Sequence, residues 1–374
     1  MPPFAFMTAT EILFGRGRLS EAAKRAASLG RRVCLVQGAN PVRSDALAEA
    51  LRAAGCDVTR FAVPHEPDEG LIEAGIAAAR GSEVVISLGG GAVIDAGKAL
   101  AAMLAAARPL RDHLEVVGLG LPLDHAPLPF IAIPTTAGTG AEVTRNAVIG
   151  VAEHRRKVSL RDPRMLPRLA IVDPALTDHT PKGVTLASGL DAVTQVIEPF
   201  LCTRANPLTD ALCADAIPKG LAALMRLMEA EDPQARDQMA WVSLCGGLAL
   251  ANAGLGVVHG LAGPLGGLKP APHGAICGAL LPHGLAMNRR RAGDPSRIDR
   301  VIGWIAGAFG SAPDQALATL ADWSRHHGLP TLSTMGFDTA DLALAAEAAA
   351  TSSSMQANPA RLDRDDLMTI LSAA

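Results

Sequence analysis

Hydrophobic and polar positions follow two different patterns along the chain. In roughly the first half, short hydrophobic runs rich in β-branched residues alternate with alanine-rich segments of helical periodicity. The short runs predict strands buried on both faces, at residues 32–37, 83–88, 129–134 and 169–172. The alanine-rich segments predict helices, at residues 44–55, 68–80 and 92–107. This alternation is typical of a mostly parallel sheet with crossover helices.

Beyond residue 180 the strand pattern nearly disappears, and helical periodicity continues to Ala374. We therefore expect an α/β domain at residues 1–178 and an all-helical domain at residues 179–374. Residues 240–268 contain no Asp, Glu, Lys or Arg, a length that would suit a membrane span. Because glycines and Pro264 interrupt this segment, we interpret it as a broken pair of core helices.

The composition limits the class of protein. Hydrophobic residues make up 49% of the 374 residues and the net charge is −3, which indicates a large core and argues against nucleic-acid binding. The six cysteines include no C-x-x-C pair, so a zinc knuckle is not expected, and isolated thiols fit a reducing compartment. The N-terminal sequence lacks the features of a secretory signal. We expect a cytoplasmic protein without membrane partners.

A glycine triplet, Gly89, Gly90 and Gly91, follows one predicted strand and opens a predicted helix. Without side chains, its backbone N–H groups can approach a phosphate closely, and the start of a helix favours an anion. The motif is neither G-x-G-x-x-G nor a P-loop. Taken alone, it fits a tight strand-to-helix turn without a ligand equally well.

A threonine-rich loop follows the predicted strand at residues 129–134. Thr135, Thr136 and Thr139 offer hydroxyl groups suited to a phosphate or a ribose. The alternative is a Thr-capped turn into a helix, because Thr139 and Glu142 have the spacing of a capping box. Both loops would leave the carboxyl ends of parallel strands, where open α/β sheets bind nucleotides. Together they favour nucleotide binding.

Four polar residues are candidates for a site in the helical part. Asp191 and Gln195 lie four residues apart, on one face of a helix, and a carboxylate in an apolar helix needs a partner or a cation. His259 and His273 lie fourteen residues apart, and each precedes a glycine. This spacing allows one histidine to end a helix and the other to begin the next. Two histidines in matching contexts favour a site over a satisfied core residue.

In their order and spacing, these motifs resemble the iron-containing (group III) alcohol dehydrogenase superfamily along essentially the whole chain. The resemblance implies a dehydroquinate synthase-like fold, with a Rossmann-like α/β N-terminal domain, an all-α C-terminal domain and an active site in the cleft between them. It implies hydride transfer between NAD or NADP and a small alcohol, aldehyde or ketone. A divalent metal, Fe or Zn, would polarise the substrate oxygen, and the protein would be a homodimer.

The resemblance also assigns roles to individual residues. The glycines would hold the pyrophosphate, the threonines the diphosphate and nicotinamide side, Lys157 a ribose and Leu176 the adenine side. The full set of implied cofactor residues is Gly89, Gly90, Gly91, Asp95, Lys98, Thr135, Thr136, Thr139, Lys157 and Leu176. The implied metal ligands are Asp191, Gln195, His259 and His273, of which the two histidines would also be catalytic.

Three positions depart from the family pattern. Gln195 stands where a histidine ligand is expected, Gly263 where many members carry a further histidine, and Ala141 where serine is frequent. A carboxamide oxygen is a weaker donor than imidazole towards transition metals, so we expect a weakened metal site. Without metal, His259 or His273 would have to supply the proton or hydrogen bond to the substrate oxygen.

That metal-free scheme resembles maleylacetate reductases, although no arginine cluster is apparent for their dianionic substrate. A lyase resembling dehydroquinate synthase and a non-catalytic nucleotide-binding protein are further alternatives. The absence of tyrosine excludes short-chain dehydrogenases and aldo-keto reductases, which use a tyrosine proton donor. Gly38 follows the first predicted strand without an acidic side chain, and Arg43 lies nearby, which permits the 2′-phosphate of NADP.

Overall fold

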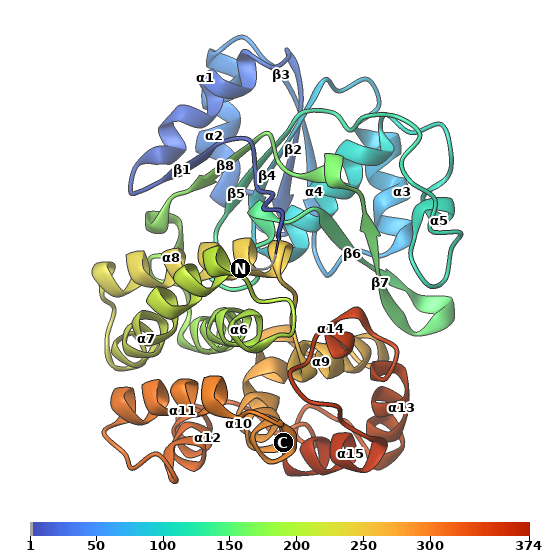
Figure 1. Ribbon diagram of the computed structural model, residues 1–374. Coiled ribbons are helices and arrows are strands. Elements are labelled where there is room, and N and C mark those ends of the chain that lie inside the picture. The colour runs from blue at the N-terminus through green and yellow to red at the C-terminus, as the bar shows by residue number, and fades with distance from the viewer. Residues whose placement is uncertain (1–2) are drawn as a thin grey trace. The chain divides into compact units, whose positions relative to one another are not determined.

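The computed structural model describes residues 3–374, which divide into two compact units (Figure 1). The sheet unit comprises Thr8–Thr136 and Gly140–Thr177. The helical unit comprises Asp178–Ala374, the segment Ala137–Thr139 and the N-terminal residues up to Met7. The division is therefore not a single cut in the chain, and the domains at 1–178 and 179–374 stay a prediction.

A six-stranded sheet forms the centre of the sheet unit, and all of its strand pairs are parallel. The strands, in their spatial order, are β1 (Ile12–Phe14), β8 (Leu169–Val172), β5 (Phe130–Pro134), β4 (Val84–Gly89), β2 (Arg32–Gly38) and β3 (Asp57–Val63). The four predicted strands are confirmed. The strands β1 and β3 were not predicted, because β1 is short and β3, at the sheet edge, carries exposed polar residues.

Helices cover both faces of this sheet (Figure 1). The first pair is α1 (Ala22–Ala27) and α2 (Val42–Ala53), and the second pair is α3 (Glu69–Ala78) and α4 (Gly91–Met103). Successive residues of a strand point to opposite faces. Leu35 of β2 accordingly joins the core with the first helix pair, and Val36 joins the core with the second. The predicted crossover helices are confirmed.

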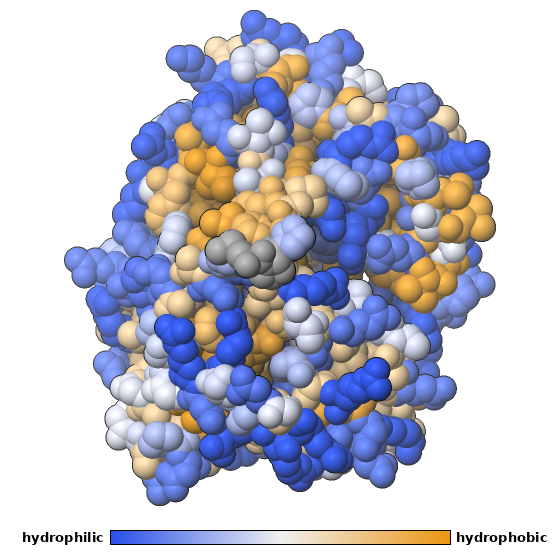
Figure 2. Space-filling model, viewed as in Figure 1, coloured by the Kyte–Doolittle hydropathy of each residue, from blue (hydrophilic) through white to orange (hydrophobic). Residues whose placement is uncertain are grey.

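The remainder of the sheet unit consists of short elements. An antiparallel hairpin pairs β6 (Asn146–Val151) with β7 (Arg156–Arg161), and one short helix, α5, spans Leu110–His113. The 3₁₀ turns are η1 (Arg18–Glu21), η2 (Ala141–Val143), η3 (Ala152–His154), η4 (Pro163–Met165) and η5 (Pro174–Thr177). Figure 2 shows apolar surface beside α5, where the following residues Val116 and Leu119 are exposed.

The structure contradicts the alternative interpretation of the threonine loop, a Thr-capped turn into a helix. After Thr139, Gly140 adopts a left-handed conformation with φ of 58°, and only the three-residue turn η2 follows. No side chain caps that turn. The loop is therefore irregular, and none of its threonine hydroxyl groups caps η2.

The helical unit is a cluster of helices around one hydrophobic core. Its helices are α6 (Lys182–Leu201), α7 (Pro207–Glu229), α8 (Pro233–Asn252), α9 (Val257–Leu268), α10 (His273–Arg291), α11 (Ser296–Phe309), α12 (Ala316–His326), α13 (Thr339–Ala349), α14 (Ser353–Gln356) and α15 (Arg364–Ala373). Helix α6 is central, because α7, α8 and α10 all pack against it. Its residues from Gly189 to Leu201 are buried.

The uncharged segment forms parts of α8 and α9, which meet at a bend of 95°. Among residues 3–374, no single helix is long and apolar enough to cross a membrane. Within this range, only the bent pair of α8 and α9, counted as one segment, has the required length and hydropathy. Most residues of both helices are buried within the protein. The prediction of a broken pair of core helices is confirmed.

Candidate metal centre and cofactor loops

Three helices of the helical unit bring four potential ligands together. Asp191 comes from α6, His259 from α9, and both His273 and Cys277 from α10. One ligand atom from each residue lies within 4.8 Å of the others. Asp191 and His259 are buried, whereas the side chain of His273 is 32% exposed. The group is therefore accessible from the side of His273.

The ligand atoms lie close together, at distances longer than those of ordinary N–H···O hydrogen bonds. Nε2 of His259 lies 3.4 Å from Oδ1 of Asp191, and Nε2 of His273 lies 3.9 Å from the same oxygen. The sulfur of Cys277 lies 3.6 Å from Nε2 of His273. The two imidazole rings are tilted by 49°, with centroids 5.6 Å apart. All of these atoms surround one small volume.

Two of these atoms lack the partner that a buried polar atom needs. Within residues 3–374, Oδ1 of Asp191 and Nε2 of His259 are buried and have no hydrogen-bond partner. Leaving such an atom unsatisfied costs about 1–3 kcal/mol, and more when the group is charged. A cation between them would satisfy both, and oxygen, nitrogen and sulfur donors suit a divalent transition ion. The residues present therefore fit the metal that the family resemblance implies.

Glu198 fixes the orientation of His259. About two helical turns beyond Asp191 on α6, its Oε2 accepts a hydrogen bond of 2.6 Å from Nδ1 of His259. Its two oxygens also accept hydrogen bonds from the backbone N–H groups of Val258 and His259 at the start of α9. With Nδ1 engaged by Glu198, Nε2 is the ring nitrogen that faces Asp191.

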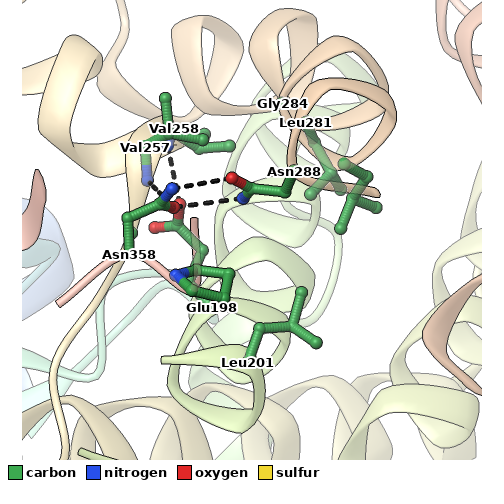
Figure 3. Close-up of a pocket in the computed structure, with 11 residues that line it drawn as sticks. Glu198, Leu201, Val257, Val258, Leu281, Gly284, Asn288 and Asn358 are labelled. Atoms are coloured by element: carbon green, nitrogen blue, oxygen red, sulfur yellow. Dashed lines mark hydrogen bonds between the residues drawn. The ribbon is translucent and has the colours of Figure 1, made fainter. Parts of the chain in front are cut away.

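A pair of buried amides supports the same helix start (Figure 3). Asn358 accepts a hydrogen bond of 3.0 Å from the backbone N–H of Val257. Asn288 of α10 and Asn358 donate to each other, at 3.1 Å and 2.6 Å. Glu198 and both asparagines line the pocket that Figure 3 shows. The first turn of α9, which carries His259, is therefore held by side chains from two other segments.

The neighbouring sulfur and carboxylates stabilise the charged form of both histidine rings. Burial alone would lower the pKa of His259, but its interactions with the Cys277 sulfur, Asp191 and Glu198 raise that pKa well above the usual range. Interaction with the Cys277 sulfur is the largest cause that raises the pKa of His273 to about 9. Burial opposes ionisation of Asp191, yet its contacts with the two histidines lower its pKa. The surroundings thus stabilise positive charge at this place.

Gln195 lies on α6 one turn after Asp191, as predicted, but its hydrogen bond leads elsewhere. The Nε2 group of Gln195 donates to the backbone carbonyl of Thr139 at 2.5 Å. On α8, a Cβ atom at Gly246 would lie 3.3 Å from this Nε2, so glycine leaves room for the carboxamide. The carboxamide therefore anchors the segment Ala137–Thr139 within the helical unit. Its role as a metal ligand stays a prediction.

The glycine loop and the start of the threonine loop, Thr135 and Thr136, lie side by side in the sheet unit. Gly89 pairs with Pro134 across β4 and β5, and the N–H of Thr135 donates to the carbonyl of Gly89 at 3.0 Å. A Cβ atom on Gly90 would lie 3.3 Å from Oγ1 of Thr136. Gly91 begins α4. The expectation that both loops leave neighbouring carboxyl ends of parallel strands is confirmed.

Lys98 and Asp95, on α4, form a buried polar cluster. The Lys98 ammonium group donates to the carbonyl of Ala141 at 3.0 Å, to Oγ1 of Thr144 at 2.8 Å and to the carbonyl of Asn146. It also lies 3.3 Å from Asp95. Lys98 is 1% exposed. This geometry ties α4 to the η2–β6 segment and leaves no open side of the ammonium group for a phosphate.

Lys157 and Leu176 lie in separate parts of the sheet unit. Lys157 is on β7 of the hairpin, and its ammonium group pairs with Glu66. Leu176 is in η5 after β8, and it packs half-buried against the core that includes α1 and α2. Both residues belong to segments other than the glycine and threonine loops. Their cofactor roles stay predictions.

The sequence-based prediction was wrong for the place of one histidine and missed two residues. His259 does not end a helix, because it is the third residue of α9, whereas His273 begins α10 as expected. Cys277 was overlooked because a thiol in an apolar run indicates a core residue. Its spacing from His273, four residues on one helix, was the available signal. No local signal indicated that Glu198 would reach His259.

Two family models match nearly the whole chain. The family described as iron-containing alcohol dehydrogenase matches residues 9–174, and its C-terminal family matches residues 185–374. The chain is 30% identical to the NAD-dependent methanol dehydrogenase of Bacillus methanolicus over 383 residues that cover 97% of both chains. It is 35% identical to the lactaldehyde reductase of Escherichia coli (strain K12) over 298 residues, covering 79% of this chain and 77% of that one.

Among solved structures, 1,3-propanediol oxidoreductase is similar to this chain, with a TM-score of 0.88, 29% identity and 99% of both chains covered. The predicted fold class, an α/β domain with a parallel sheet and a helical C-terminal domain, is confirmed by this similarity. The family matches span nearly the whole chain, and relatives of similar length are dehydrogenases and reductases. The chain belongs to the iron-containing alcohol dehydrogenase family and is an oxidoreductase of that kind.

Proposed function

We propose that the protein transfers hydride between a nicotinamide dinucleotide and a small alcohol or its aldehyde or ketone, with a divalent metal at Asp191, His259 and His273. The buried Oδ1 of Asp191 and Nε2 of His259, which have no hydrogen-bond partner among the described residues, carry this proposal. Two relatives support the substrate class, because their names refer to methanol and lactaldehyde. We retain the predictions that the protein is cytoplasmic and a homodimer.

The cofactor would bind at the glycine loop and the threonine loop, which follow the neighbouring strands β4 and β5. Gly89, Gly90 and Gly91 would hold the pyrophosphate at the start of α4, and the hydroxyl groups of Thr135, Thr136 and Thr139 would contact the diphosphate and nicotinamide portions. Lys157 would contact a ribose, and Leu176 would lie on the adenine side. For Asp95 and Lys98 we propose support of the loop rather than direct contact, because Lys98 is buried and fully bonded.

The reaction moves one hydride and one proton. In alcohol oxidation the carbinol carbon gives a hydride, with its electron pair, to the nicotinamide ring, and the hydroxyl oxygen loses a proton as the carbonyl forms. When bound, a divalent cation supplies Lewis-acid polarisation of the substrate oxygen. Asp191 and His259 would hold that cation from the buried side. His273, whose side chain is 32% exposed, marks the side from which substrate approaches and the proton leaves.

Gln195 would lower the affinity for iron relative to family members with histidine there. Its carboxamide is neutral and already donates to Thr139. If the metal were absent in the active protein, His259 or His273 would have to donate the hydrogen bond to the substrate oxygen, as in a maleylacetate reductase-like scheme. The family match favours an oxidoreductase over the lyase and the non-catalytic alternatives.

We also propose that NADP is accepted beside NAD. Gly38 ends β2, and a Cβ atom there would meet nothing within 4 Å. The position therefore offers neither a carboxylate to bind the ribose hydroxyls nor a steric barrier to a 2′-phosphate. Arg43 is exposed near the start of α2 and could pair with that phosphate.

Absorbance of reduced nicotinamide during incubation with a panel of small alcohols and aldehydes tests the proposal. We expect net turnover with NAD or NADP, and loss of turnover after chelation that zinc or iron restores. Full activity in protein shown by elemental analysis to be metal-free would remove the metal from the mechanism. Substrate conversion without net cofactor turnover would indicate a lyase, and cofactor binding without conversion a non-catalytic protein.

A further inference from the structure

Cys277 is the fourth member of the group of potential metal ligands, in which the sequence carries glutamine at position 195 in place of a histidine. Among residues 3–374, it is the one cysteine that belongs to a group of potential metal ligands, together with Asp191, His259 and His273. Cys277 is fully buried on α10, one turn after His273. Its sulfur lies within 4.8 Å of Oδ1 of Asp191 and Nε2 of His259, two buried atoms without a hydrogen-bond partner in the described residues. Two independent features, a donor atom and unsatisfied buried partners, thus point to one occupant.

The distances match the edges of a tetrahedron around one metal ion. With metal–nitrogen and metal–oxygen bonds of about 2.0–2.1 Å and a metal–sulfur bond of about 2.3 Å, neighbouring nitrogen and oxygen ligands lie about 3.4 Å apart and nitrogen and sulfur about 3.6 Å apart. The structure has 3.4 Å between His259 and Asp191, and 3.6 Å between Cys277 and His273. A third edge, from His273 to Asp191, is 3.9 Å, and the other three are no longer than 4.8 Å. Little movement is needed to close this set.

We propose that Cys277 replaces the missing histidine as the fourth metal ligand, so that Asp191, His259, His273 and Cys277 bind zinc in preference to iron. This inference rests on the metal site in the proposed function and specifies its ligands. The ligand form of cysteine is the thiolate, so binding releases the thiol proton to solvent. A thiolate with imidazoles and one carboxylate in tetrahedral arrangement selects zinc over harder ions.

This ligand set still leaves room for substrate. Zinc expands from four to five ligands in some catalytic sites. Asp191, His259 and Cys277 close the set from the buried side, whereas His273 is partly exposed. A substrate oxygen therefore has one direction of approach, past His273. The Gln195 carboxamide keeps its separate task of holding the carbonyl of Thr139.

Cobalt(II) as a spectroscopic substitute for zinc tests this assignment on the full-length protein. The wild-type protein should show a sulfur-to-cobalt charge-transfer band in the near ultraviolet, and Cys277→Ser should lose it. Cys245→Ser removes another buried thiol of the same unit, from α8, and should keep the band. In chelator competition, Cys277→Ser should lower zinc affinity by more than the roughly 10–100-fold typical of losing a partner that only orients a ligand.

The outcomes separate this inference from the proposed function. Cobalt binding to the wild-type protein without a thiolate band, or with a band that Cys277→Ser retains, would overturn the role of Cys277 and leave the metal site standing. No cobalt or zinc binding by the wild-type protein would overturn both. If Cys277→Ser does not fold, X-ray absorption at the zinc edge of the wild-type protein decides, since we expect one sulfur neighbour at about 2.3 Å. A shell of nitrogen and oxygen alone would refute the proposal.

Discussion

The carboxylate of Glu198 accepts a hydrogen bond of 2.6 Å from Nδ1 of His259, which determines that Nε2 of the same ring faces Asp191. The two oxygens of Glu198 also bind the first turn of α9. One side chain therefore sets the position of the helix, the rotation of the ring and the nitrogen that is free. Glu198 is a positioning residue for the metal centre.

Replacing Glu198 with Gln should weaken metal binding without removing a ligand. The carboxamide has one acceptor oxygen and no charge, so it cannot serve Nδ1 and both backbone N–H groups equally well. We expect zinc affinity to fall about 10–100-fold, as for other partners that orient a ligating histidine. Chelator competition measures this change. The control is Glu347→Gln, which changes an exposed glutamate of α13. Equal zinc affinities of the two variants would contradict the role of Glu198.

Lys98 should contribute to stability much more than an exposed lysine does. Lys98→Met removes a buried ammonium group bonded to three oxygens and leaves the partly buried Asp95 with only the backbone N–H of Val148 as a partner among the described residues. Breaking a buried pair in this way costs about 3–5 kcal/mol. Lys219→Met removes an exposed pair with Asp215 and should change the free energy of unfolding by less than about 1 kcal/mol. Urea unfolding of both variants makes the comparison, and similar midpoints would refute it.

Glycine at position 97 serves packing rather than cofactor binding. A Cβ atom there would lie 1.9 Å from Oγ of Ser87 and 2.8 Å from the ring of Phe130, so α4 approaches the sheet more closely than alanine permits. Gly97→Ala should destabilise the protein by about 1–3 kcal/mol. At Gly303, in α11, an added Cβ meets nothing within 4 Å, and alanine should stabilise by about 0.5–1 kcal/mol. Thermal unfolding measures both changes. Melting temperatures that shift in the same direction for Gly97→Ala and Gly303→Ala would contradict this explanation.

Glu142 should make stability fall as the pH rises. Burial raises the pKa of Glu142 in the folded state from 4.5 to about 7, so between these values the folded protein holds a proton that the unfolded chain has lost. The stability linked to this proton is fully present below pH 4.5 and is lost as the pH rises through about 7. Relative to Glu142→Gln, the free energy of unfolding of the wild-type protein should fall by up to about 3 kcal/mol between pH 4.5 and pH 8.

Urea unfolding of both proteins at several pH values within that range measures this difference. Glu142→Gln preserves the size of the side chain and removes its titration, so every other group contributes equally to the two curves. Parallel curves for the wild-type protein and the variant would show that Glu142 keeps an ordinary pKa in the folded protein.

The sequence predicted elements whose pattern is local and missed relationships that depend on packing. Strand β4 was predictable because its residues are all buried and form one apolar run, whereas β3 alternates exposed and half-buried residues and resembles a polar segment. The direction of Gln195 was not predictable, since it depends on where the carbonyl of Thr139 lies. Cys277 lies in an apolar run of the sequence, as core residues do. It becomes part of a polar group only because Asp191 of α6 and His259 of α9 lie beside it.

A histidine at position 195 should restore metal binding to a protein that lacks Cys277. Position 195 lies one helical turn after Asp191, where the resemblance to the family implies an imidazole ligand. In Cys277→Ser, zinc affinity should be low, and adding Gln195→His should raise it at least about tenfold, because an imidazole is a stronger donor than the carboxamide it replaces. Chelator competition measures both proteins.

Gln195→Ala in the same background is the matched control, because it also removes the hydrogen bond to Thr139 but brings no donor. Rescue by histidine and not by alanine would show that positions 195 and 277 supply the same coordination site from two helices. Equal affinities of the two double variants would mean that position 195 does not reach the metal. In that case the role of Cys277 would have to be judged from its sulfur signal alone.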